Sequence, residues 1–191
     1  MTTKLKVTRK RNFSAHHMLI GAARAALEDA NQRRPGWFYS ELTAITLSAL
    51  SIEAMCNAIG DRIIDGWKDF ENASPLAKLR LLCERLNISY DKSKEPWVSA
   101  IWLCRFRNLI AHAKPEIIAE EYVWTRSEYD SRRTDEPKSK LERLITRGNA
   151  AKALTTAESI KTSLCEKISP EDRLGLYSDA WEGSARGISD D

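Results

Sequence analysis

The chain of 191 residues lacks the short motifs that mark many enzyme families. It has no glycine-rich phosphate loop, no G-x-G-x-x-G pattern and no serine-hydrolase elbow, which argues against nucleotide-dependent and serine-hydrolase chemistry. It has only three histidines, and their spacing from the cysteines is not that of a zinc site. No repeat of ~20–50 residues occurs, so we do not expect a solenoid.

Close cysteine pairs and long apolar runs are also missing. The four cysteines form no C-x-x-C pair and each lies within an apolar helical pattern, which favours small buried side chains in a reducing compartment. They are Cys56, Cys83, Cys104 and Cys165. Nothing approaches the ~18 apolar residues of a membrane span, and the start of the chain has no signal-peptide run. We therefore expect a cytoplasmic protein without a membrane segment.

Charge is distributed unevenly along a chain whose net charge is only +3. The total is too small to argue for nucleic-acid binding. Residues 1–13 hold five basic side chains and no acid, whereas residues 171–191 hold six acids against two arginines. We interpret the basic N-terminal segment as a solvated tail, with contact to nucleic acid as the alternative. The end of the chain is an acidic tail.

Hydrophobic periodicity predicts five helices separated by proline and glycine breakers. The predicted helices span residues 14–31, 38–64, 74–87, 97–113 and 139–168, the last with a possible break at residues 148–149. No stretch alternates convincingly as a strand does. The sequence therefore predicts an all-α, up-and-down bundle over residues 14–170. A short helix around residues 174–181 is compatible with the pattern of the tail.

The connection at residues 114–137 is long and weakly periodic. Connections longer than ~12–15 residues are uncommon and often functional. This one interleaves aromatic residues with arginines, as sites for single-stranded RNA do. Packing of an amphipathic segment on the bundle surface is the simpler interpretation.

One face of the fourth predicted helix, here called the stripe, is apolar at its start and polar at its end. Trp97, Ile101 and Cys104 are followed on the same face by Asn108 and His112, with Arg107 beside the stripe. Polar groups on a buried face need partners. This stripe therefore ends either in hydrogen bonds inside the bundle, or in a cleft or subunit interface.

These three polar residues have complementary chemistry. An imidazole gives or takes a proton near neutral pH, a guanidinium forks onto phosphate oxygens, and an amide orients the imidazole or stabilises an oxyanion. Together Arg107, Asn108 and His112 suit cleavage of RNA by its own 2′-hydroxyl without a metal. A histidine favoured by the helix dipole is the simpler interpretation of His112. The same spacing recurs between Arg11 and His16, which we interpret as coincidence.

The six residues from Arg107 to His112, RNLIAH, resemble the Arg-x4-6-His signature of the HEPN superfamily, as does the proline that follows at position 115. The resemblance extends beyond this signature. Residues 51–60 are similar to the second-helix pattern of these domains, and residues 74–79 resemble the start of their third helix. It covers about residues 14–115.

Membership would imply a HEPN-like bundle that forms a homodimer through the motif-bearing helices. Many members are endoribonucleases of toxin–antitoxin systems and phage defence that need no metal or other cofactor, so RNA and an antitoxin or other defence protein are the implied partners. Arg107 and His112 would be the catalytic pair and Asn108 the adjacent polar residue. A non-catalytic module that binds RNA or a protein partner is the alternative.

Three further residues are candidates for supporting roles. Glu53 interrupts the apolar middle of its helix, so it is a candidate partner for Arg107 or His112, and an ion pair with another base is equally consistent with its position. Arg105 and Lys114 are candidate RNA contacts, although solvated charges are the simpler interpretation of both.

Overall fold

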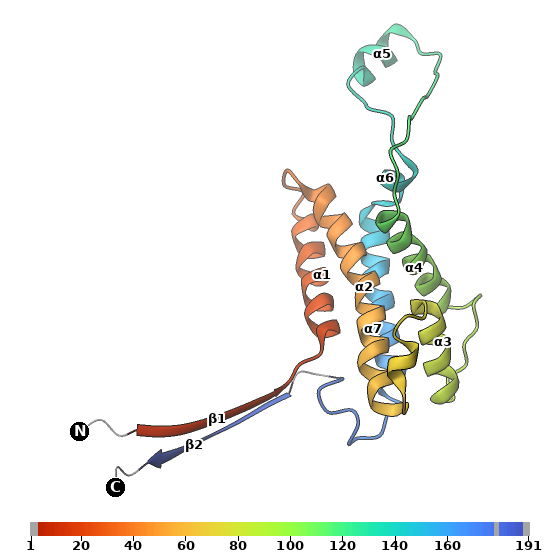
Figure 1. The fold of residues 1–191 in the computed structure, drawn as a ribbon. Helices are drawn as coiled ribbons and strands as arrows, with labels where there is room; N and C mark the ends of the chain where they lie inside the picture. The colour runs from red at the N-terminus through yellow and green to blue at the C-terminus, as the bar shows by residue number, and fades with distance from the viewer. Residues whose placement is uncertain (1–3, 178–179, 189–191) are drawn as a thin grey trace.

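The computed structural model describes residues 4–177 and 180–188, and it is mostly helical, as the sequence predicts (Figure 1). The helices are α1 (Ala15–Asn31), α2 (Trp37–Ile63), α3 (Pro75–Arg85), α4 (Trp97–Ala111), α5 (Arg126–Arg132), α6 (Lys140–Leu144) and α7 (Arg147–Cys165). A 3₁₀ turn, η1 (Trp67–Phe70), precedes α3. Two strands, β1 (Lys4–Asn12) and β2 (Ala180–Ile188), complete the described elements.

Helix α2 is the central element of the bundle. It packs against α1, α3, α4 and α7, so most of the core lines its sides. Among the described helices it alone is long and apolar enough to cross a membrane, yet half of its most apolar window is buried inside the fold. Burial of this extent is typical of a helix that packs in the core of a bundle.

Small residues let these helices approach one another closely. Ala44, Ala153 and Ala157 are fully buried between α2 and α7 or their neighbours. Near the end of α2, Gly60 lies against the indole of Trp67, and a Cβ at that position would come within 2.3 Å of the ring. The core therefore has no spare volume where η1 folds back onto α2.

The helix predicted over residues 139–168 is in fact two helices. The chain breaks at Ile145 and Thr146, not at residues 148–149, because the Thr146 hydroxyl accepts a hydrogen bond from the Asn149 amide and caps α7. Gly148 falls in the first turn of α7. Glycine is well tolerated there, so it does not end the helix.

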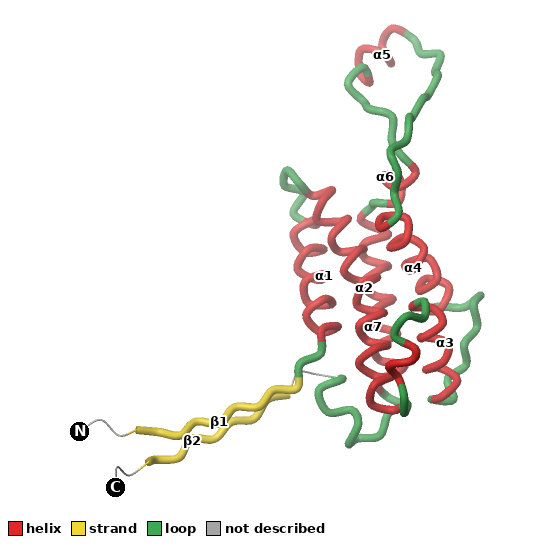
Figure 2. The backbone as a smooth tube through the Cα atoms, viewed as in Figure 1, coloured by secondary structure: helices red, strands yellow, loops and turns green. Residues whose placement is uncertain are grey.

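The expectation of no strands is wrong, because β1 pairs with β2 as a two-stranded antiparallel ribbon. The basic N-terminal segment is therefore not a free tail over Lys4–Asn12. The short helix expected around residues 174–181 is not formed in the described residues, since residues 171–176 are turns and β2 begins at Ala180. Figure 2 shows the ribbon leaving the bundle next to the start of α1.

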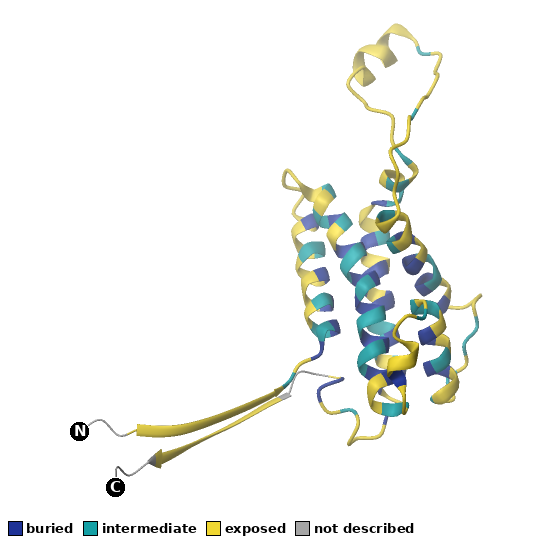
Figure 3. Ribbon diagram, in the orientation of Figure 1, coloured by how far each residue is buried: buried dark blue, intermediate teal, exposed yellow. Residues whose placement is uncertain are grey.

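Residues 114–139, here called the projecting loop, extend from the end of the bundle opposite the ribbon (Figure 1). The simpler interpretation, amphipathic packing on the bundle, is wrong, because α5 has no buried residue and the loop stands in solvent (Figure 3). Two side chains in it, Ile117 and Val123, are fully exposed.

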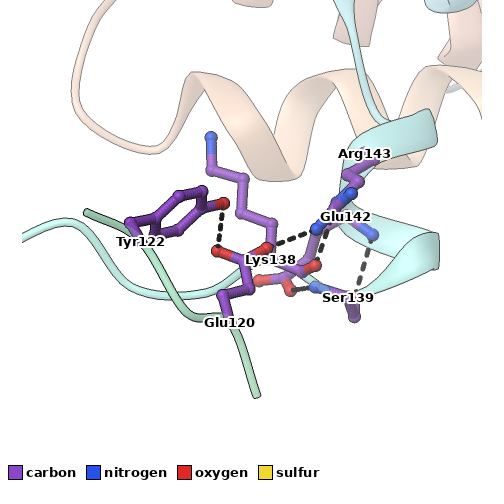
Figure 4. Close-up of polar contacts among 6 residues, drawn as sticks. All are labelled: Glu120, Tyr122, Lys138, Ser139, Glu142 and Arg143. Atoms are coloured by element: carbon purple, nitrogen blue, oxygen red, sulfur yellow. Dashed lines mark hydrogen bonds and ion pairs between the residues drawn. The ribbon is translucent and has the colours of Figure 1, made fainter. Parts of the chain in front are cut away.

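The projecting loop is ordered at its base by polar contacts (Figure 4). Glu120 accepts a hydrogen bond from the Tyr122 hydroxyl at 2.9 Å and pairs with Arg143 of α6. Ser139 and Glu142 form a capping box that starts α6. A hollow of about 990 Å³ within the loop is lined by both acidic and basic side chains.

Candidate functional site

The stripe of α4 runs from the core to the surface of the bundle. Trp97 and Cys104 are buried, whereas Asn108 and His112 are exposed. The last turn of α4 therefore lies at the surface, where the projecting loop begins. Arg107 lies between these two environments, and a third of its side chain is exposed.

The guanidinium of Arg107 is held by two partners. Nη2 donates to Oε2 of Glu53 on α2 at 3.0 Å, and Nη1 donates to Oδ1 of Asn108 at 3.0 Å. These contacts fix the plane of the guanidinium at the edge of the bundle. Of the two partners considered for Glu53, the structure pairs it with Arg107.

The other oxygen of Glu53 faces a lysine that sequence reasoning missed. Nζ of Lys78 on α3 lies 3.6 Å from Oε1 of Glu53, and the Lys78 side chain is 1% exposed. One carboxylate thus sits between two cations from two different helices. The available signal was position: Lys78 lies one turn before Leu82, on the apolar face of α3, where an unpaired charge is costly.

His112 lies at the end of the helix and its side chain is exposed. It is the C-cap residue of α4, and its backbone N–H donates to the carbonyl of Asn108 at 3.0 Å. Within residues 4–177 and 180–188 its imidazole makes no hydrogen bond or ion pair, so the structure brings Arg107, Asn108 and Glu53 together but leaves His112 beside them, open to solvent.

The two candidate phosphate contacts are also exposed. Arg105 lies on α4 and Lys114 two residues after His112, and neither forms an ion pair with a described residue. Residues 105–115 contain no acid, so the end of α4 is basic. The backbone carbonyl groups at the C-terminus of α4 carry partial negative charge, which partly offsets this positive charge.

The buried cysteines near this cluster are protonated thiols. Burial, with a smaller contribution from the negative charge of Glu53, raises the pKa of Cys104 to about 11. Burial also raises the pKa of Cys83 to about 12, and burial likewise raises the pKa of Cys56. A thiolate nucleophile is therefore not available here near neutral pH.

The second match to the motif has a structural role. His16 is fully buried, and its Nε2 donates to the carbonyl of Leu176 at 2.9 Å. Arg11 lies in β1, with its guanidinium over the ring of Phe13. The buried His16 ring thus holds the chain at the base of the ribbon, and our interpretation of the Arg11–His16 spacing as coincidence stays a prediction.

Comparison with known proteins returned no relative. No family model matches the chain, no curated protein is significantly similar to it, and no solved structure shares its fold at a significant level.

Proposed function

We propose that this protein is a HEPN-like, metal-independent endoribonuclease whose reaction centre comprises Arg107, Asn108 and His112. One observation carries the proposal. The guanidinium of Arg107, which is permanently charged and oriented by Glu53 and Asn108, lies near the end of α4, and the solvent-exposed imidazole of His112 follows at the C-cap of the same helix. An orienting network around one cation, beside an imidazole that can take or give a proton, suits phosphoryl transfer at RNA.

The chemistry requires one proton taken and one returned. The 2′-oxygen of a ribose attacks the adjacent phosphorus, the P–O5′ bond breaks, and a 2′,3′-cyclic phosphate forms. Neutral His112 accepts the 2′-hydroxyl proton, or its protonated form donates to the departing 5′-oxygen. Arg107 stabilises the charge that develops on the non-bridging phosphate oxygens. Arg105 and Lys114 contact neighbouring phosphates.

The proposal includes a homodimer through α4. In-line attack places the 2′-oxygen and the departing 5′-oxygen on opposite sides of the phosphorus, so a base and a separate acid suit the reaction, and two copies of α4 side by side supply two imidazoles. Leu109 lies beside Asn108 and is 42% exposed, so this end of α4 offers an apolar contact. Light scattering at micromolar concentration should give the mass of two chains. A monomer would contradict this part of the proposal.

The test of the activity is cleavage of purified cellular RNA in the presence of EDTA. Wild type should give fragments ending in 2′,3′-cyclic phosphate. We expect His112→Ala and Arg107→Ala to lower the rate at least a hundredfold, the size typical of a lost acid–base or charge-stabilising group. His17→Ala and Arg80→Ala, which change the same residue types elsewhere, should cut at the wild-type rate once their folding is checked by circular dichroism.

The alternative function is a non-catalytic module that binds RNA or a protein partner. No cleavage by any variant, together with RNA binding that depends on Arg107, would favour it and refute the nuclease. Forced expression is a second readout. A nuclease should arrest growth, and Arg107→Ala should relieve the arrest.

A further inference from the structure

The ribbon formed by β1 and β2 has a fixed direction and a strong charge. Its described residues include six basic side chains and one acid, Glu182, which pairs with Lys10 at 3.6 Å. Nine residues of paired strand span roughly 30 Å at ~3.4 Å per residue. Neither strand has more than slight contact with the helices, so both faces of the ribbon are open (Figures 2 and 3).

The base of the ribbon is anchored in the core. The Ser14 hydroxyl donates to the carbonyl of Gly175 at 2.9 Å, and the buried His16 ring donates to the next carbonyl. Gly175 has φ of +77°, and a Cβ there would come within 2.5 Å of the Asn12 side chain. Only glycine fits this contact, so the chain is tightly held where the ribbon leaves the bundle.

One cross-strand pair on the ribbon is electrostatically unfavourable. Lys6 and Arg186 are direct partners in the register, so their side chains share a face. Like charges directly opposite one another destabilise a strand pair. Both side chains are exposed, and neither forms an ion pair with any residue in the described ranges. The next rung on the same face is Thr8 opposite Ser184, which offers two hydroxyl donors.

We propose that this face binds the phosphate backbone of single-stranded RNA. The inference rests on the proposed function, which makes RNA the polymer, and cleavage by a 2′-hydroxyl needs an unpaired strand that can place its oxygen in line with the leaving group. A phosphate between Lys6 and Arg186 turns their repulsion into attraction to a shared anion. Thr8 and Ser184 donate to the next phosphate along the strand.

A second copy of the ribbon is a poorer occupant of this face. Pairing two such ribbons would bring two strongly basic segments together. Lysines along an exposed strand edge also oppose edge-to-edge association. A polyanion satisfies the same charges, so charge complementarity favours RNA over self-association.

The ribbon and the end of α4 lie at opposite ends of the bundle (Figure 1). Helix α2, with 27 residues, spans roughly 40 Å of that separation at ~1.5 Å per residue. An RNA strand stacked at the duplex spacing of ~3.4 Å per nucleotide therefore needs about 12 nucleotides to cover the length of α2 alone. The ribbon is thus an accessory site that selects long RNA.

The test measures binding of fluorescein-labelled, unstructured 30-nucleotide RNA by anisotropy, with His112→Ala as the background so that no cleavage interferes. Lys6→Ala with Arg186→Ala should weaken binding about tenfold at 0.15 M salt, and reduce the slope of log K against log salt by about 0.7, because the one phosphate that these two side chains share is no longer neutralised. The matched control changes two exposed basic residues of the bundle, Arg80→Ala with Lys92→Ala, and should bind as the background does.

A second variant separates binding from folding of the ribbon. Arg186→Glu places opposite charges on the Lys6 rung, so it stabilises the strand pair while it removes a phosphate contact. Weaker binding by this variant supports the proposal. Unchanged affinity and salt slope in both ribbon variants would overturn it.

Three further arms make the outcome specific. A 6-nucleotide RNA is too short to contact the ribbon and the end of α4 together, so the ribbon variants should weaken its binding less than they weaken binding of the 30-nucleotide RNA, and an equal loss contradicts the accessory role. Tighter binding of single-stranded or duplex DNA of the same sequence overturns the assignment to RNA. A change of mass in light scattering assigns the face to self-association. If wild type proves inactive on RNA but the ribbon variants still lose affinity, the nuclease fails and the RNA-binding face stands.

Discussion

Replacing Glu53 by glutamine tests the ion cluster at the proposed reaction centre. The change keeps the shape of the side chain and an oxygen that accepts from Arg107, but it removes the negative charge that faces Lys78. The Lys78 ammonium is almost fully buried, and Glu53 is its ion-pair partner among the described residues. The variant therefore leaves a buried charge without a counterion.

The size of the effect follows from burial. Removing one partner of a fully buried pair costs about 3–5 kcal/mol of unfolding free energy. A quarter of the Glu53 side chain is exposed, so water offsets part of the loss and about 2–3 kcal/mol is expected. For a chain of this size that lowers Tm by roughly 4–12 °C. Urea and thermal unfolding followed by circular dichroism measure both quantities.

A double-mutant cycle checks the reason for the loss. Lys78→Met added to Glu53→Gln removes the stranded charge and leaves an apolar side chain of similar length, so most of the lost stability should return. Glu84→Gln, on the exposed face of α3, is the control and should stay within about 0.5 kcal/mol of wild type. The reasoning is refuted if Glu53→Gln is as stable as wild type, or if the double variant is as unstable as Glu53→Gln alone.

Three other predictions follow from the fold. Gly60→Ala should lower the free energy of unfolding in urea by about 1–3 kcal/mol, because the added methyl group overlaps Trp67. Gly21→Ala, which lies in open space on α1, should raise the free energy of unfolding by up to about 1 kcal/mol. Equal effects of the two substitutions would contradict the packing of Gly60 on Trp67. The fold raises the pKa values of Cys83 and Cys104 to about 12 and 11, whereas an unfolded cysteine has a pKa of ~8.5, so the unfolded chain loses these protons at lower pH than the folded chain does. The free energy of unfolding should therefore fall as pH rises from about 9 to 12. A free energy of unfolding that does not change over this range would refute the prediction. Trypsin should cut the projecting loop first and leave the circular dichroism of the bundle unchanged, since none of the side chains of α5 is buried; early cuts in α2 or α7 would show the reverse.

The helices that local signals define could be predicted from the sequence. The Ser74–Pro75 pair set the start of α3, where the Ser74 hydroxyl accepts from the Ala77 amide as a cap should. Glu53 was recognisable because it interrupts an apolar helix face, and such a charge needs a partner. These features depend on residues a few positions apart, or on the cost of burying one charge.

The ribbon could not be predicted in the same way. Its strands are more than 160 residues apart in sequence, so no turn motif announces their pairing. Both faces are exposed, so burial imposes no alternation of polar and apolar residues along either strand. Lys78 was missed for a different reason: its helical position indicates the core, but only the fold shows that Glu53 lies opposite it.

The sharing of Glu53 by two cations has a consequence for RNA binding. One carboxylate neutralises one of the two charges, and since Lys78 is buried, the remaining positive charge is available to solvent only through Arg107. Lys78→Met should therefore let Glu53 neutralise Arg107 and weaken RNA binding several-fold without any loss of contact to RNA. The double variant restores the balance of charge, and Glu53→Gln alone increases it. Affinities for RNA are compared in the His112→Ala background. Glu53→Gln should bind RNA most tightly and Lys78→Met most weakly. The background with Glu53 and Lys78 unchanged and the Glu53→Gln, Lys78→Met double variant should bind RNA equally, with an affinity between these two. Any other order would mean that Lys78 serves only the stability of the bundle.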